Sequence, residues 1–87
     1  MKYTRPVLKK LEQLFETVGY QVRYEKGQFR SGYCVLKERR VVVVNKFFPL
    51  EGRIRCLLDL LPELRIDPQN LPAAQRDWLL HLERSHA

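Results

Sequence analysis

The stretch SGYCVLKERRVVVVNKFFPLEGRIRCLLDLL, residues 31–61, decides the fold of this chain. It holds two apolar runs, YCVL at 33–36 and VVVV at 41–44, which are joined by a tight charged turn around Glu38-Arg39 and followed by a helical pattern. Two short apolar runs separated by such a turn are typical of a β-hairpin. Because consecutive positions are apolar, we expect both faces of this hairpin to be shielded from water.

Two amphipathic helices frame the strands. Before them, Thr4 and Gly19 supply the start and stop signals of a helix whose apolar positions follow the spacing of one buried face: Val7, Leu8, Leu11, Leu14, Phe15 and Val18. After the hairpin, a second helix begins near Pro49, and Pro62 ends or kinks it. Its apolar stripe comprises Leu50, Ile54, Leu57, Leu58 and Leu61.

Two further elements complete the predicted order. Residues 20–25 alternate apolar and polar side chains, which indicates a strand with one buried face, at or near a sheet edge. Pro72 opens a last helix that runs to about Arg84. The sequence therefore predicts one small α+β domain, residues 1–87, with the order α-β-β-β-α-α and a three-stranded antiparallel sheet packed by helices. We expect the first two helices to cover one face of the sheet, and the final helix or a second copy of the chain to cover the other.

Charge is spread unevenly over this basic chain of 87 residues. The net charge of +6 divides into +8 for residues 1–55 and −2 for residues 56–87. Such an asymmetry attracts acidic partners. The longest apolar runs are four residues, far below the ~18 that cross a bilayer, and the N-terminus lacks the apolar core of a signal peptide. We therefore predict a cytoplasmic protein with no membrane partner.

Residues that carry chemistry are few and scattered. His81 and His86 lie five positions apart, so they do not share one helical face as a metal-binding pair would. Cys34 and Cys56 are flanked by apolar residues, which favours reduced, buried thiols, with a disulfide between them as the open alternative. No nucleophile motif or zinc spacing is present. The sequence predicts no catalytic residues, no enzyme, no metal, no cofactor and no small-molecule ligand.

The best candidate for a functional surface mixes cations and aromatic rings. Residues 23–33 interleave these side chains, and Phe47-Phe48 places two rings at a strand-to-helix junction, where only one easily enters the core. The alternative is a plain loop whose rings turn inward. We expect a module that binds a protein partner or its own copy; nucleic-acid binding by the same surface is the alternative. The predicted contact residues are Arg23, Lys26, Phe29, Arg30, Lys46 and Phe47.

Three segments of the chain resemble a known family. Ser31-Gly32-Tyr33, the hairpin through Val41 to Asn45, and the helix containing Arg53-Ile54-Arg55 resemble the N-terminal half of the ImmA/IrrE metallopeptidases. In that family the helix after the hairpin carries a His-Glu-x-x-His zinc motif. The matching positions here hold Leu58, Asp59 and Pro62. The resemblance therefore implies a third function, a metallopeptidase-like scaffold that has lost its metal ligands.

Overall fold

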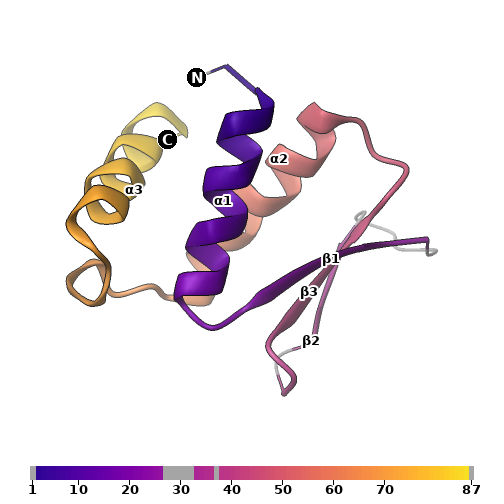
Figure 1. Ribbon diagram of the computed structural model, residues 1–87, viewed down its shortest axis with the longest axis horizontal. Helices are drawn as coiled ribbons and strands as arrows, with labels where there is room; N and C mark the ends of the chain where they lie inside the picture. The colour runs from indigo at the N-terminus through magenta and orange to yellow at the C-terminus, as the bar shows by residue number, and fades with distance from the viewer. Residues whose placement is uncertain (1, 27–32, 37, 87) are drawn as a thin grey trace.

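The fold places three helices around a small sheet (Figure 1). The computed structural model describes residues 2–26, 33–36 and 38–86. The predicted α+β class and the order α-β-β-β-α-α are confirmed, with two short 3₁₀ turns inserted before the last helix. The elements are α1 (Arg5–Thr17), β1 (Gln21–Glu25), β2 (Tyr33–Leu36), β3 (Val41–Asn45), α2 (Leu50–Leu60), η1 (Leu61–Leu64), η2 (Pro68–Asn70) and α3 (Ala73–His86).

The sheet is mixed, and the prediction of a purely antiparallel sheet is wrong. Its strand order is β1-β3-β2, so the predicted edge position of β1 is confirmed. Strands β2 and β3 form the predicted antiparallel hairpin, but β1 pairs with β3 in parallel, with Gln21 opposite Val41 and Glu25 opposite Asn45. The physical reason is that β3 inserts between β1 and β2. Strands β1 and β2 run in opposite directions and are not paired with each other. Because β3 runs opposite to β2, it runs parallel to β1.

Strand β3 is buried on both faces, as predicted, but Leu36 of β2 is 42% exposed, so the expectation that the whole hairpin is shielded from water is wrong for this edge strand. Successive side chains of a strand point to opposite faces. Val42 and Val44 belong to the main core, whereas Val41 and Val43 point the other way and are still only 8% and 6% exposed. A run of four valines with no polar alternation is typical of a central strand.

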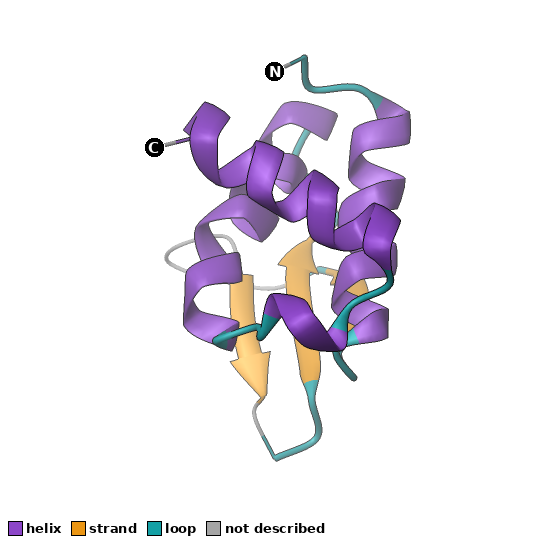
Figure 2. Ribbon diagram, turned by 90° about the vertical axis from the view of Figure 1, so that its left-hand side faces the viewer, coloured by secondary structure: helices purple, strands orange, loops and turns teal. Residues whose placement is uncertain are grey.

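Helices α1 and α2 pack against each other over one face of the sheet (Figure 1). Helix α3 lies on the far side of these two helices from the strands, as the turned view also shows (Figure 2). The expectation that the final helix covers the second face of the sheet is therefore wrong. The chain follows this path after α2: Arg65 ends η1 in a left-handed conformation (φ 50°, ψ 53°), and η2 then leads into α3.

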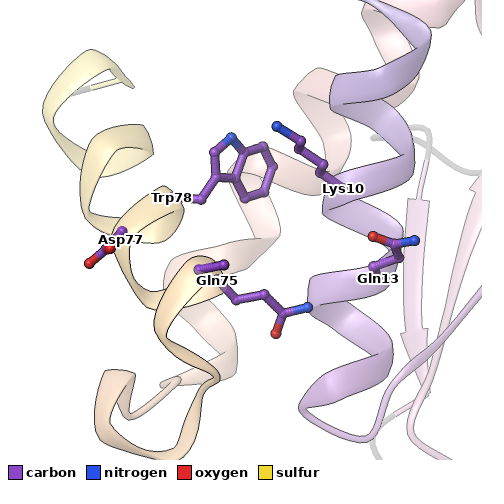
Figure 3. A pocket seen from close by; sticks show the side chains of 6 residues that line it. Lys10, Gln13, Gln75, Asp77 and Trp78 are labelled. Atoms are coloured by element: carbon purple, nitrogen blue, oxygen red, sulfur yellow. The ribbon is translucent and has the colours of Figure 1, made fainter.

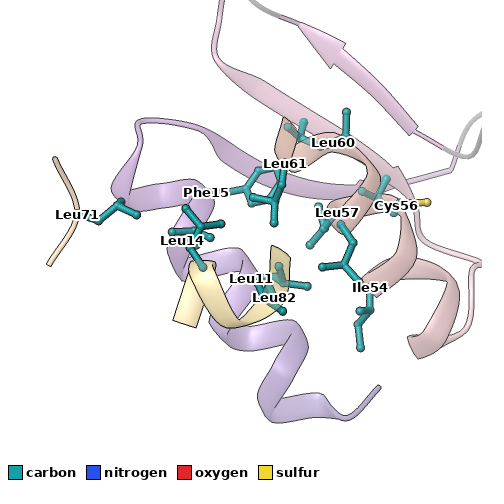
Figure 4. Packing of buried hydrophobic residues seen from close by; sticks show 14 residues of the cluster. Leu11, Leu14, Phe15, Ile54, Cys56, Leu57, Leu60, Leu61, Leu71 and Leu82 are labelled. Carbon is teal, nitrogen blue, oxygen red and sulfur yellow. The ribbon is translucent and has the colours of Figure 1, made fainter. Parts of the chain in front are cut away.

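One apolar cluster joins all three helices to the sheet (Figure 4). Leu11, Leu14 and Phe15 of α1 are fully buried, and Leu79 and Leu82 anchor α3 to the same cluster. The cluster also takes in Val42, Val44, Ile54, Cys56, Leu57, Leu58, Leu60, Leu61 and Leu71. Within the described ranges, no helix is both long and apolar enough to cross a membrane.

The predicted helix signals act where the sequence puts them. The backbone N–H of Val7 donates to the Thr4 hydroxyl oxygen at 3.4 Å, which caps α1. Gly19, just past its end, has a φ of +91°, a conformation that glycine adopts without strain. Helix α2 ends at Leu60, and Pro62 lies in the 3₁₀ turn that follows. The turn at Gly19 leads directly from α1 into β1, and these two elements pack against each other.

Candidate functional site

The parallel pairing of β1 with β3 brings some of the predicted contact residues together at one end of the sheet. The carboxyl ends of β1 and β3 lie side by side, and the backbone N–H of Lys46 donates to the carbonyl of Glu25 at 3.1 Å. Lys26 and Lys46 therefore follow neighbouring strand ends, with Phe47 next in the chain. Arg23 lies nearer the middle of β1, where it pairs with Glu25 at 2.9 Å. Phe29 and Arg30 lie outside the described residues.

Phe47 is the most exposed large apolar side chain in the described part of the chain, at 66%. The Lys46 ammonium lies 5.3 Å from the centre of its ring, a cation–π distance. Phe48 takes the other role: it is partly buried and packs against the core cluster and close to Gly52. The expectation that only one of the two rings enters the core is confirmed.

Hydrogen bonds hold the backbone that carries Phe47. The N–H of Phe47 donates to the side-chain oxygen of Asn45 at 3.0 Å. From α2, the Arg53 guanidinium donates to the carbonyls of Phe48 at 3.0 Å and Lys46 at 2.6 Å. Charge-assisted bonds of this kind are stronger than neutral ones. The exposed ring therefore projects from a braced turn.

Arg53 also belongs to a polar cluster that sequence reasoning missed. Its guanidinium lies 4.7 Å from the centre of the Tyr24 ring, and the Tyr24 hydroxyl donates to a carboxylate oxygen of Glu12. Burial raises the pKa of the Tyr24 phenol well above its usual range; the hydrogen bond to Glu12 and the charge of Glu12 act in the same direction, and the charge of Arg53 opposes them. The phenol is therefore a stable hydrogen-bond donor that joins α1, β1 and α2.

A surface groove of about 510 Å³ lies between α1 and the start of α2, beside this cluster. Leu8, Phe48 and Leu50 give it an apolar floor. Arg5 and Lys9 stand one helical turn apart on α1, and neither is in an ion pair within the described ranges. Its full lining is Arg5, Leu8, Lys9, Glu12, Phe48, Pro49, Leu50 and Arg53. We call this groove, together with Lys46 and Phe47, the junction surface.

The resemblance to the ImmA/IrrE family matches Leu58 and Pro62 to the metal-binding histidines of that family. Neither residue can bind a metal. Leu58 is 2% exposed and belongs to the core cluster, and Pro62 lies beyond the end of α2. Among the residues that the structure describes, no three of His, Cys, Asp and Glu come together as a metal site. Cys56 is a free, buried thiol whose pKa is raised by burial and by the charge of Asp59. A thiol in this state is a poor nucleophile.

Comparisons of the chain with protein-family models, with curated proteins and with solved structures found no match. The likeness to the ImmA/IrrE family accordingly stays a prediction from the residues quoted above.

Proposed function

We propose that this chain is a non-catalytic binding module whose junction surface takes an acidic segment of a protein partner. The single observation that carries the proposal is the exposed Phe47 ring, which stands on a backbone braced by Asn45 and Arg53. Because the backbone beneath the ring is already held, binding orders little main chain there, and aromatic anchors dominate the energetics of protein interfaces.

Charge supports the choice of an acidic segment. Lys46 lies beside the ring, Lys26 follows the neighbouring strand end, and Arg5 and Lys9 line the groove without ion pairs in the part of the chain that the structure describes. The carboxylate in the groove, Glu12, already accepts a hydrogen bond from Tyr24. Cations of this kind steer an acidic partner and set its register, while the apolar floor contributes buried area.

A peptide display library tests the proposal directly, because it offers the chain many candidate segments at once. The wild-type chain should enrich peptides in which Asp or Glu flank an aromatic or aliphatic residue. The doubly substituted Lys46→Glu, Phe47→Ala chain should lose this enrichment. Leu80→Ala is the matched control, because Leu80 is also a large exposed apolar side chain, 44% exposed, but lies on α3. Enrichment that survives the double substitution, or enrichment of basic peptides, would contradict the proposal.

A second copy of the chain is one form of protein partner, since residues 56–87 carry a net charge of −2. Sedimentation equilibrium of the wild type and of Phe47→Ala separates this case from a different partner. If copies associate through the junction surface, the wild type forms a dimer that the Phe47→Ala chain does not. A dimer that Phe47→Ala leaves intact uses another surface.

Nucleic-acid binding is the second candidate, and the observation that favours it is the meeting of Lys26 and Lys46 at one end of the sheet. Salt distinguishes it from protein binding, because each neutralised phosphate releases counterions and the affinity falls steeply and log-linearly with salt. A gel-shift titration with a 20-nucleotide single strand and its duplex decides the matter. No shift at low salt removes this candidate.

The resemblance to the ImmA/IrrE metallopeptidases supports the non-catalytic part of the proposal. If the chain shares that scaffold, Leu58 and Pro62 stand where the metal ligands would be. Leu58 packs in the core, and Pro62 lies in the turn after α2. Elemental analysis of the purified protein tests this directly, and stoichiometric zinc would contradict it.

A further inference from the structure

Strand β1 is an edge of the sheet and pairs with β3 on one side only. Backbone bonds at its two ends join Gln21 and Glu25 to the residues that flank β3. In a parallel pair, alternate residues of a strand bond to the same neighbour. The main-chain N–H and C=O groups of Val22 and Tyr24 therefore point to the outer edge, where no other segment of the described ranges bonds to them.

This outer edge is open in the fold. Figure 1 looks onto β1 with β3 and β2 behind it, and no helix is drawn in front of the strand. Val22 and Tyr24 turn their side chains toward the core, whereas Gln21, Arg23 and Glu25 share the opposite face. An edge strand with unpaired main-chain groups is a template on which another strand can add.

The charges of β1 indicate which strand fits this edge. Arg23 and Glu25 form an ion pair at 2.9 Å, and their side chains are 52% and 45% exposed. A second β1 can lie antiparallel to the first across a two-fold axis. If Tyr24 lies opposite itself, each Arg23 lies opposite the Glu25 of the other copy. If Arg23 lies opposite itself, two like charges meet, which is destabilising. Charge therefore favours the register with Tyr24 at the axis.

We propose that two copies of this chain pair edge to edge through β1 and form one continuous six-stranded sheet. At the two-fold axis, Tyr24 exchanges both main-chain bonds with Tyr24 of the second copy, and Val22 pairs with Lys26 on either side. On the face away from the core, Arg23 and Glu25 of both copies form a ring in which the sign of the charge alternates. This interface goes beyond the proposed function, because it leaves the junction surface free to bind a partner.

Sedimentation equilibrium of the wild-type chain, from about 10 µM to about 1 mM, tests whether copies associate. Because one pair of short strands buries a small area, we expect a dissociation constant between about 10 and 500 µM. Phe47→Ala should leave this dimer intact, which distinguishes it from association through the junction surface. A chain that stays monomeric over the whole range, or a dimer that Phe47→Ala abolishes, would overturn the inference.

Charge reversal tests the register. Arg23→Glu alone and Glu25→Arg alone each place like charges opposite one another, so each should weaken the dimer at least about tenfold. Net charge predicts the opposite for Arg23→Glu, since it lowers the general repulsion between two basic copies. An equal mixture of the two variants should regain the wild-type affinity, because the reversed charges then face each other.

Arg55→Glu is the matched control for this experiment, because Arg55 forms a similarly exposed ion pair with Glu51 on α2, also at 2.9 Å. It should leave the dimer unchanged. The absence of recovery in the mixture, or equal weakening by Arg55→Glu, would show that β1 does not pair in this register.

Hydrogen exchange tests the main-chain bonds without a substitution. The amide hydrogens of Val22 and Tyr24 face the open edge, whereas those of Arg23 and Glu25 face β3. Raising the protein concentration from about 5 µM to about 1 mM should slow exchange at Val22 and Tyr24 at least about twofold, and leave Arg23 and Glu25 unchanged. Exchange at Val22 and Tyr24 that is independent of concentration would contradict the edge-to-edge dimer.

Discussion

At the scale of single residues, Tyr24 joins three elements through one side chain. Its hydroxyl donates to Glu12 of α1, and its ring stacks against Arg53 of α2. Arg53 in turn holds the carbonyls of Lys46 and Phe48 at the junction surface. A change at Tyr24 is therefore expected to affect both stability and the exposed ring of Phe47, although the two residues are far apart in the sequence.

Replacement of Tyr24 by Phe should change how stability depends on pH. Burial and Glu12 raise the folded-state pKa of the phenol above its ordinary value of 10.0, so the stabilisation is fully present below that pH. It is lost as the pH rises from there toward the folded-state pKa, because the unfolded chain then ionises first. We expect the wild type to lose more of its free energy of unfolding than Tyr24→Phe between about pH 8 and pH 11.

Urea unfolding over that pH range measures the difference. Tyr20→Phe serves as the control, since the Tyr20 hydroxyl makes no hydrogen bond in the described part of the chain. Tyr24→Phe should also be about 1 to 2 kcal/mol less stable than the wild type near neutral pH, because the wild-type hydrogen bond to Glu12 is intact there. Parallel pH profiles for the wild type and Tyr24→Phe would contradict the role given to this phenol.

Gly19→Ala tests the turn between α1 and β1. Gly19 has a φ of +91°, and an added Cβ would lie 2.9 Å from the Arg40 guanidinium. We expect a loss of about 1 to 2 kcal/mol in the free energy of unfolding, because an L side chain is strained at positive φ. Gly52→Ala is the matched control: its Cβ would meet Phe48 at 3.2 Å, but the helical backbone there suits alanine. Equal effects of the two changes in thermal or urea unfolding would contradict this explanation.

At the scale of elements, the sequence predicts which segments form strands better than how the strands pair. The four valines of residues 41–44 predict a strand buried on both faces, and the structure places it at the centre of the sheet. The parallel pairing of β1 with β3 could not be predicted, because the alternation in β1 is the same in either strand direction. Helix ends were predictable because local residues, Thr4 and Pro62, decide them.

The site was predictable only in part, for a related reason. Lys46 and Phe47 follow an apolar strand directly, so their exposure can be expected from the local pattern. The contacts of Tyr24 with Glu12 and Arg53 depend on how α1, β1 and α2 pack, and no spacing in the sequence encodes this. A surface pocket of about 470 Å³ between α1 and α3 (Figure 3) likewise depends on where α3 docks, and the sequence predicted that position incorrectly.

Leu82→Ala tests the docking of α3 on α1 and α2. Leu82 is buried in the core cluster, so its truncation should lower the free energy of unfolding by about 2 to 4 kcal/mol. Leu80 on the same helix is exposed, and Leu80→Ala should change it by less than about 0.5 kcal/mol. Both values come from urea unfolding. A small effect at Leu82 would show that α3 does not pack where the structure places it.

At the scale of the whole molecule, we expect net charge and the exposed aromatic ring to contribute to binding in different ways. Residues 1–55 carry a net charge of +8, and the junction surface lies within this part of the chain. Long-range attraction raises the association rate of an acidic partner, whereas the buried area of an aromatic anchor slows its dissociation. Substitution can test the two contributions because Lys46 carries the charge and Phe47 carries the exposed ring.

Binding kinetics of a library-selected peptide should show this division. Lys46→Glu should lower mainly the association rate, with a smaller effect as salt rises, because charges at the rim of an interface act mainly on encounter. Phe47→Ala should raise mainly the dissociation rate, by at least about tenfold. Surface plasmon resonance at two salt concentrations gives both rates. If the two variants act on the same rate constant, the proposed division of roles is wrong.

The most direct test of the central claim is a map of where an acidic peptide binds. A ¹H–¹⁵N spectrum of the labelled chain, titrated with the library-selected peptide, reports every backbone amide at once. The junction surface predicts that the largest shifts fall on residues 45–50 and on the first two turns of α1, and that they vanish in Phe47→Ala but persist in Leu80→Ala. Largest shifts on α3 or on the middle of β1, unchanged by Phe47→Ala, would contradict the account.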